Sequence, residues 1–246
     1  MHDERQTPSG DGQPDAARVG AGQAIYAPFS LAVYDVVVHG ISNHFIWRCP
    51  TYQLRRLYDR NVTARHVDVG VGTGYFLARA HWPVARPEIT LVDLNPHCLA
   101  RAAGRISRLS PGMVEANVFE PLPAAQMGKP YTSAGLCYLL HCLPGSMKQK
   151  AQVFDHLVPH LADGAHVFGA TILPGDATGR GAPNWAARQL MRIYNAKGVF
   201  SNEGDRIEDL EAELARRFEV VDIRLYGTVA LFEARYRGAD RAASTP

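Results

Sequence analysis

Hydrophobic and polar positions follow two alternating patterns from residue 65 onward. Short β-branched runs, such as RHVDVGV (65–71) and EITLVDL (88–94), are each followed by segments with apolar residues at helical spacing, such as PHCLARAAGRISRL (96–109). The alternation continues to AHVFGATIL (165–173). Nearly continuous apolar strands joined by helices are typical of a parallel sheet covered on both faces. The pattern predicts an α/β fold with a doubly wound sheet.

The segments around this alternation divide the chain further. The last of them, EVVDIRLYGTVALFEARY (219–236), predicts two strands joined at Tyr226–Gly227, an antiparallel C-terminal hairpin. Pro50 suits the first turn of a helix at the end of the N-terminal region. The expected divisions are a disordered tail (1–22), an N-terminal helical lid (23–64), a main domain (65–238) with a substrate-cap insert (175–203), and a flexible C-terminus (239–246).

Composition narrows the class of protein. A chain of 246 residues suits one α/β domain with additions. The net charge of +2 argues against a surface that tracks nucleic acid. The four cysteines form no CxxC pair, so no metal site is expected. No apolar run approaches the length of a membrane span, and no signal peptide is apparent, so we expect a cytoplasmic protein, monomer or homodimer, that does not act at membranes.

A glycine-rich loop follows the first strand, where ligands bind in such sheets. It reads Asp68-x-Gly70-x-Gly72-x-Gly74, and Tyr75 occupies the position where a dinucleotide-binding loop needs its third glycine. There is also no phosphate-binding G-x-x-x-x-G-K-[ST] loop. The ligand expected is therefore a nucleoside with a cationic or zwitterionic arm, whose ammonium group Asp68 would bind. The alternative is that these are ordinary turn glycines.

Two later strand ends supply further polar groups. Asp93 ends the second strand, 19 residues after Gly74, and an acid there can accept both ribose hydroxyls. It could instead cap the following helix. Asn117 follows the third strand, where it could bind the adenine amino group between Leu94 and Val118, or could simply belong to a turn.

These motifs carry a resemblance to a known family. VDVGVGTGYFL (67–77), LVDLNP (91–96), ANVFEPLP (116–123) and LLHCLPG (139–145) resemble successive motifs of the class I S-adenosylmethionine-dependent methyltransferases, in the small-molecule branch that includes quinone and natural-product enzymes. The resemblance covers roughly residues 65–236. It implies a Rossmann-like, seven-stranded, mostly parallel sheet and S-adenosylmethionine as cofactor, with S-adenosylhomocysteine as product.

The resemblance also implies roles for individual residues. Asp68 and the loop glycines would hold the methionine part, Asp93 the ribose, and Asn117 with Val118 the adenine. Leu94 and Tyr138 complete the expected cofactor-binding set. The family usually has aspartate at the position of Asn117. The side-chain carbonyl of asparagine can still accept a hydrogen bond from the adenine amino group.

The expected catalytic residue is His141. It lies at the turn after the fourth strand, beside the reactive methyl in this fold, and histidine is well matched to act as a general base at neutral pH. Alternatively it caps the next helix or packs in the loop. An acceptor carbon, or a phenol of low pKa, needs no base, so oxygen, nitrogen and carbon acceptors all remain open.

Aromatic residues outside the sheet predict the acceptor pocket. Aromatic walls with a few polar tips suit a flat, mostly apolar ligand, although each ring could also be ordinary core. The expected substrate is thus a small aromatic or polyketide-like metabolite. The expected substrate-binding residues are Tyr26, Tyr34, His44 and Trp47 from the lid, and Trp185 and Tyr194 from the insert, with Phe29, Asn43, Met191, Asn195 and Phe200 as further candidates.

Three other functions fit parts of the pattern. The protein could use the sulfonium only as a fixed positive charge in non-methylating chemistry. It could be an NAD(P)-dependent oxidoreductase, although Tyr75 argues against this. It could also be a non-catalytic binding module.

Overall fold

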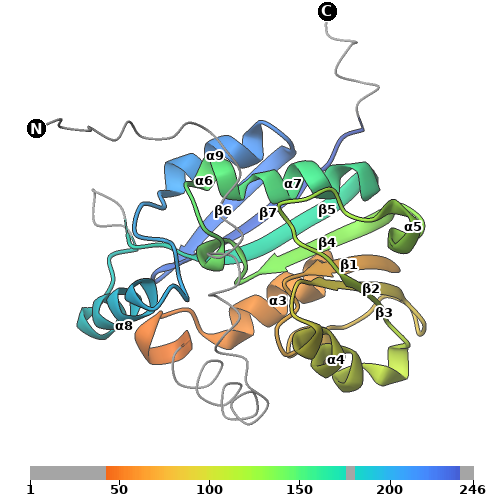
Figure 1. Cartoon of the computed structure of the whole chain (residues 1–246), viewed down its shortest axis with the longest axis horizontal. Coiled ribbons are helices and arrows are strands. Elements are labelled where there is room, and N and C mark those ends of the chain that lie inside the picture. Colours follow the sequence, from red (N-terminus) through yellow and green to blue (C-terminus); the bar gives the residue numbers. More distant parts are fainter. Residues whose placement is uncertain (1–42, 176–180, 239–246) are drawn as a thin grey trace, which may run out of the picture.

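A seven-stranded sheet lies at the centre of the computed structural model, which describes residues 43–175 and 181–238 (Figure 1). The strand order is β3-β2-β1-β4-β5-β7-β6. Only the pairs that involve β7 are antiparallel. The predicted parallel sheet with an antiparallel C-terminal hairpin is therefore confirmed. The strands are β1 (Arg65–Val69), β2 (Glu88–Asp93), β3 (Gly112–Glu115), β4 (Tyr131–Cys137), β5 (Leu161–Ile172), β6 (Glu219–Tyr226) and β7 (Val229–Arg235).

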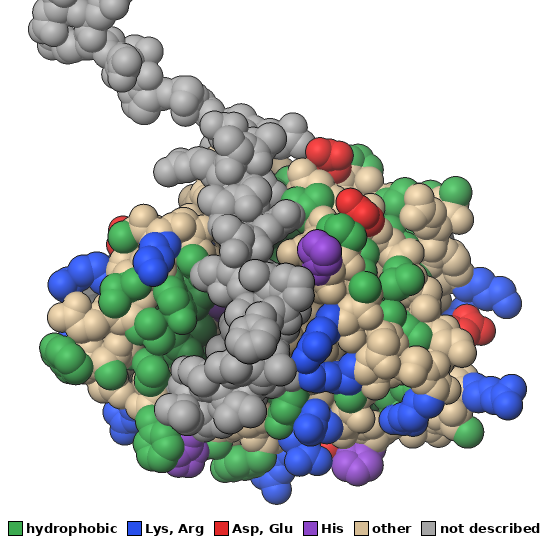
Figure 2. All heavy atoms as spheres, turned by 60° about the horizontal axis from the view of Figure 1, so that its bottom comes forward, with side chains coloured by type: hydrophobic (Ala, Val, Ile, Leu, Met, Phe, Trp, Pro, Cys, Tyr) green, Lys and Arg blue, Asp and Glu red, His purple; other side chains and the backbone are tan. Residues whose placement is uncertain are grey.

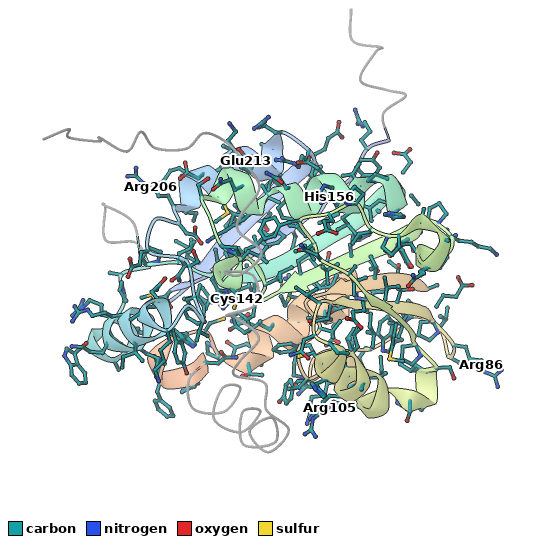
Figure 3. The ribbon with its side chains drawn as sticks, in the orientation of Figure 1. Arg86, Arg105, Cys142, His156, Arg206 and Glu213 are labelled. Carbon is teal, nitrogen blue, oxygen red and sulfur yellow. The ribbon has the colours of Figure 1, made fainter. Side chains whose placement is uncertain are left out.

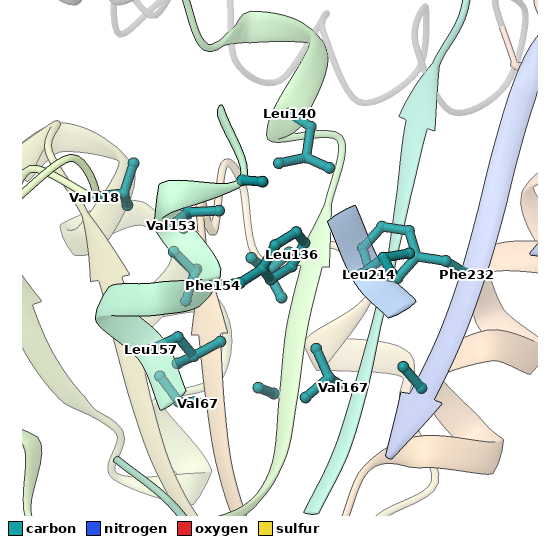
Figure 4. Packing of buried hydrophobic residues seen from close by; sticks show 14 of the residues in the cluster. Val67, Val118, Leu136, Leu140, Val153, Phe154, Leu157, Val167, Leu214 and Phe232 are labelled. Atoms are coloured by element: carbon teal, nitrogen blue, oxygen red, sulfur yellow. The ribbon is translucent and has the colours of Figure 1, made fainter. Parts of the chain in front are cut away.

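Helices cover both faces of this sheet. In Figure 1, α6, α7 and α9 lie on one face, and α3 and α4 lie on the other. Each face has its own cluster of buried apolar side chains, and Figure 4 shows the cluster under α7 and α9, including Leu136, Phe154 and Phe232. The α-helices are α3 (Thr51–Asn61), α4 (Pro96–Arg105), α5 (Ala124–Met127), α6 (Met147–Lys150), α7 (Gln152–Leu157), α8 (Trp185–Ala196) and α9 (Ile207–Ala215). Shorter 3-10 helices are η2 (Leu77–Arg79), η3 (Ser107–Leu109), η4 (Leu140–Cys142) and η5 (Val158–His160).

Local sequence fixes several element boundaries. Asn95 begins α4, since its side chain accepts a hydrogen bond from the His97 amide and Pro96 occupies the first turn. Ser146 and Gln149 form a capping box at the start of α6. The final hairpin turns at Gly227, whose φ of 56° lies in the left-handed region that glycine favours.

Two segments differ from the simple strand–helix reading. The segment after the glycine loop was expected to be a helix, but it forms only the single turn η2, which ends where the Ala80 backbone becomes extended. In the expected lid, α3 buries Leu54, Leu57 and Tyr58 in the core on its face of the sheet. The predicted domain boundary at residue 64 stays a prediction.

Some sequence predictions lie outside the described residues. These are the tail (1–22), the part of the lid up to residue 42, residues 176–180 of the insert, and the C-terminal residues 239–246. Within the described ranges, no helix has the length and apolar character needed to cross a bilayer.

Candidate cofactor and acceptor site

The glycine loop turns sharply at the carboxyl end of β1. Gly70, Gly72 and Gly74 all have positive φ values, between 51° and 72°. A Cβ added to Gly74 would lie 2.9 Å from the Ala102 Cα of α4, so the loop packs closely on that helix. A Cβ added to Gly72 would meet nothing within 4 Å. The loop therefore packs against α4 at Gly74 and leaves open space beside Gly72. A loop that binds a ligand with its backbone needs such a space.

Asp93, at the end of β2, faces this loop. Its carboxylate accepts hydrogen bonds from the amides of Asn95, Gly72 and Val71, and the bond from Asn95 measures 2.9 Å. Burial raises the pKa of Asp93 to about 6, although these amides act in the opposite direction. The alternative that Asp93 caps α4 is wrong, because the cap is Asn95. The structure thus brings Asp93 and the glycine loop together, as an adenosine ribose would require.

With this raised pKa, the predicted ribose contact of Asp93 should make cofactor binding depend on pH. Ribose hydroxyls would donate to the ionised carboxylate, so binding would favour the deprotonated form of Asp93. Below its pKa of about 6, each binding event must release a proton, and the Kd should rise by up to about tenfold per pH unit. Calorimetry at pH 5, 6 and 8 measures this effect. The Asp93→Asn variant should bind more weakly at every pH and lose the slope; the same slope in that variant would assign it to another group.

Asp68 lies deeper, under the loop. It is 2% exposed, and its Oδ2 accepts hydrogen bonds from the Tyr58 hydroxyl (2.9 Å) and His66 Nε2 (3.3 Å). Its Oδ1 receives no hydrogen bond from any described residue. Burial, together with the Asp68 charge, raises the pKa of Tyr58 well above its usual value, so Tyr58 stays protonated and keeps donating. The free oxygen fits the predicted contact with an ammonium group, directly or through water.

Tyr58 and His66 were not among the predicted site residues. His66 Nδ1 also pairs with the Ser133 hydroxyl at 2.9 Å, so the carboxylate is held from α3, β1 and β4 together. In the sequence, Tyr58 shares one helix face with Leu54 and Leu57, which indicates burial but not a polar partner.

The predicted adenine-binding residues form a short turn after β3. Asn117 Oδ1 accepts from the Phe119 amide (3.1 Å), and its amide group donates to Glu120 (3.1 Å). These bonds agree with the alternative that Asn117 is a turn residue, and its role in adenine binding stays a prediction. Val118 is buried, whereas Leu94 is partly buried. Val118 therefore has less exposed surface than Leu94 with which to contact an adenine ring.

A cluster of rings lies at the carboxyl end of β4 and β5. Phe200 is its centre, with ring centroids 4.5 Å from His141, 4.9 Å from Tyr194 and 6.0 Å from Trp47. Tyr138 lies 5.7 Å from His141 and donates to Asn43 Oδ1 at 3.0 Å. Figure 3 shows Cys142, the last residue of η4, at this end of the strands. The structure thus brings together predicted residues from the lid, the fourth strand end and the insert.

His141 is 3% exposed, and its environment fixes its protonation. The Ile172 amide donates to Nδ1 at 3.3 Å, so the neutral ring carries its proton on Nε2. Burial, with a smaller effect of the Lys150 charge, lowers the pKa of His141 to about 3. Among residues 43–175 and 181–238, no group is paired with Nε2. His141 therefore presents a buried, neutral ring whose N–H has no protein acceptor in the described structure.

Two other predicted substrate residues lie on the surface of the described structure. Trp185, the first residue of α8, is 70% exposed, and His44 is also exposed. Figure 2 shows hydrophobic side chains gathered on the left of the turned molecule, the side on which α8 lies in Figure 1. Tyr26, Tyr34 and Phe29 are outside the described residues. The substrate-binding roles of all these residues stay predictions.

Polar residues beneath the ring cluster were also missed. Asn202 is fully buried, donates to the Ile172 carbonyl (2.9 Å), and exchanges hydrogen bonds with Asn195. Thr171 is buried with its hydroxyl 3.5 Å from His141 Nδ1. No metal-ligand cluster of three or more His, Cys, Asp or Glu side chains occurs in the described ranges.

Comparisons with known proteins agree with this geometry. A family model described as a methyltransferase domain matches residues 67–167. The demethylluteothin O-methyltransferase of Streptomyces thioluteus is 40% identical over 213 residues, covering 87% of this chain and 90% of that protein. The physcion biosynthesis cluster O-methyltransferase of Aspergillus chevalieri is 38% identical over 215 residues, covering 87% and 94%.

Solved structures show the same fold. The N-methyltransferase NodS from Bradyrhizobium japonicum WM9, in complex with S-adenosyl-l-homocysteine, aligns with a TM-score of 0.52 at 18% identity, covering 76% of this chain and 85% of that chain. The relatives confirm the predicted enzyme class, the family model together with this complex confirms the predicted cofactor, and the same structure confirms the predicted fold. The chain belongs to the S-adenosylmethionine-dependent methyltransferases.

Proposed function

We propose that the protein methylates a hydroxyl oxygen of a small aromatic metabolite. The observation that carries the proposal is the buried His141 N–H, which has no acceptor in the described structure and stands among Tyr138, Tyr194 and Phe200. Such rings suit a flat acceptor, and the N–H suits an oxygen atom. Relatives named as O-methyltransferases, of demethylluteothin and of the physcion cluster, support oxygen as the acceptor atom.

The chain would bind the cofactor with groups on three strand ends. The carboxylate of Asp93 accepts the ribose hydroxyls, Asp68 binds the methionine ammonium group, and the Asn117–Val118 turn flanks the adenine. When bound, S-adenosylmethionine supplies a methyl group already activated by its sulfonium. The protein's main tasks are then to align the acceptor and to exclude water.

His141 orients the acceptor in this proposal. Its Nε2–H donates a hydrogen bond to the acceptor oxygen, which strengthens as that oxygen loses its proton. The oxygen–methyl bond forms as the sulfur–methyl bond breaks, and the hydroxyl proton leaves to solvent. Acting as the general base would require the other tautomer, which places N–H against the Ile172 amide. The predicted general-base role is therefore the competing hypothesis.

Matched acceptors test the proposal. We expect a phenolic acceptor to give its methyl ether and S-adenosylhomocysteine in equal amounts. Each methyl group that reaches the acceptor converts one S-adenosylmethionine into one S-adenosylhomocysteine. The controls are the corresponding aniline and the phenol already blocked as an ether. Mass spectrometry of both products measures the result. N-methylation of the aniline alone would overturn the oxygen assignment, and turnover without S-adenosylhomocysteine would favour the fixed-charge alternative.

We further infer that the enzyme acts in the cytoplasm, as a monomer or homodimer, without nucleic acid. The cysteines of the described region, including the buried Cys49 and Cys137, are all free thiols, as in a reducing compartment. Size-exclusion chromatography with light scattering measures the oligomeric state.

A further inference from the structure

A buried lysine lies directly beneath the acceptor side of the site. Lys150, the last residue of α6, is 0% exposed. Its Nζ donates to both carboxylate oxygens of Asp205 (2.7 and 2.6 Å) and to the Ser201 carbonyl (2.6 Å). All three donors of the ammonium group are thus used inside the protein, which is the condition under which a charge can be buried.

A single residue, Ser201, links Lys150 to the ring cluster. The Ser201 amide donates to the His141 carbonyl at 2.8 Å, and the neighbouring Phe200 ring packs on the His141 ring. The carbonyl and amide of Ser201 therefore tie α6 to η4. Asn202 fixes the other side of the same turn through the Ile172 carbonyl, and the Ile172 amide donates to His141.

The arrangement determines where the acceptor wall stands. Residues 199–202 lie between α8 and α9 without regular structure of their own. Backbone bonds from Val199 and Phe200 to the Tyr194 carbonyl hold their α8 side, and the bonds of Ser201 and Asn202 hold them against η4 and β5. The Lys150 charge also disfavours a charged His141 ring, as the lowered pKa of His141 reflects.

Stability alone does not explain a buried ion pair, since well-packed apolar residues often replace one without loss of folding free energy.

We propose that Lys150 is a positioning residue for methyl transfer: its ammonium group, held by Asp205, fixes the turn at Phe200–Asn202 against His141 and so places the wall on which the acceptor packs. The inference rests on the proposed function, because it assigns this wall to the acceptor. It predicts that the pair affects acceptor recognition and turnover rather than cofactor affinity.

The test compares Lys150→Met with a matched ion-pair variant, Arg217→Met. Arg217 bonds Asp155 and Glu213 between α7 and α9, and neither partner belongs to the ring cluster. We expect Lys150→Met to lower kcat/KM for the acceptor by about tenfold to hundredfold, as a wall displaced by about 1 Å would. S-adenosylmethionine affinity should stay within about twofold, and Arg217→Met should change neither quantity beyond about twofold.

Hydrogen exchange supplies a readout that needs no activity. In Lys150→Met, the Ser201 and Asn202 amides should exchange at least about tenfold faster while β4 amides keep their protection, because only the turn loosens. If the single variant does not fold, Lys150→Met/Asp205→Met removes both charges and takes its place. Unchanged exchange at Ser201, or equal acceleration in β4, would overturn the inference. Wild-type protein that methylates no acceptor would instead refute the proposed function, leaving the exchange result to decide the role of Lys150 in holding the turn.

Discussion

Replacing Asp93 with alanine will weaken S-adenosylmethionine binding by about 2–3 kcal/mol, which is roughly a 30- to 150-fold rise in Kd. The carboxylate stands opposite the glycine loop, where Gly72 leaves space for a ligand, and is oriented by backbone amides. Two hydroxyl bonds to a charged acceptor are lost with it. Isothermal titration calorimetry of the folded variant, with S-adenosylhomocysteine as a second ligand, measures the loss.

The control for this variant is Asp163→Ala. Asp163 lies in β5, is exposed, and accepts a hydrogen bond from the Gly238 amide. It should bind the cofactor as the wild type does. Unchanged affinity in Asp93→Ala would contradict the ribose assignment, and a loss matched by Asp163→Ala would point to a general effect of removing a carboxylate.

Replacing His141 with phenylalanine will lower kcat/KM for the acceptor by about a hundredfold, the usual effect of removing one hydrogen bond to a developing oxyanion. The buried Nε2–H would be lost, while phenylalanine keeps the ring that packs on Phe200. His141→Gln retains an N–H near the same position and should recover part of the activity. S-adenosylmethionine affinity should not change in either variant.

The pH–rate profile separates the two roles of His141. A pKa of about 3 leaves the His141 ring neutral throughout the range from pH 5 to 9. With S-adenosylmethionine saturating at every pH, which removes the contribution of Asp93 to binding, no inflection near 6.5 is expected. A general base with an ordinary pKa would give a rate that rises with pH through about 6.5. If the wild type shows that rise and His141→Gln removes it, the hydrogen-bond role is refuted and the general-base hypothesis stands.

Much of the cofactor half of this site was predictable from local sequence. The Asp68–Gly74 loop and Asp93 lie where β1 and β2 end, and parallel strands bring their carboxyl ends to one edge. Strand and helix segments were visible because burial on a sheet face or helix face imposes a period on the residues. The apolar spacing after the loop did not show that this segment forms only the single turn η2, which ends at the extended backbone of Ala80.

The proposed acceptor half depends on tertiary structure. The sequence placed His141 at a strand end, but its tautomer and low pKa depend on burial and on the Ile172 amide from β5. Likewise, the sequence could not show that Tyr58 bonds Asp68, that Trp185 is exposed, or that Lys150 pairs with Asp205. Periodicity tells which residues are buried, whereas the partner of each buried polar group is set by packing between elements distant in the chain. The sequence by itself thus determined the sheet, the loop and the cofactor class, and only the folded structure determined the protonation and the partners of the buried polar groups around His141.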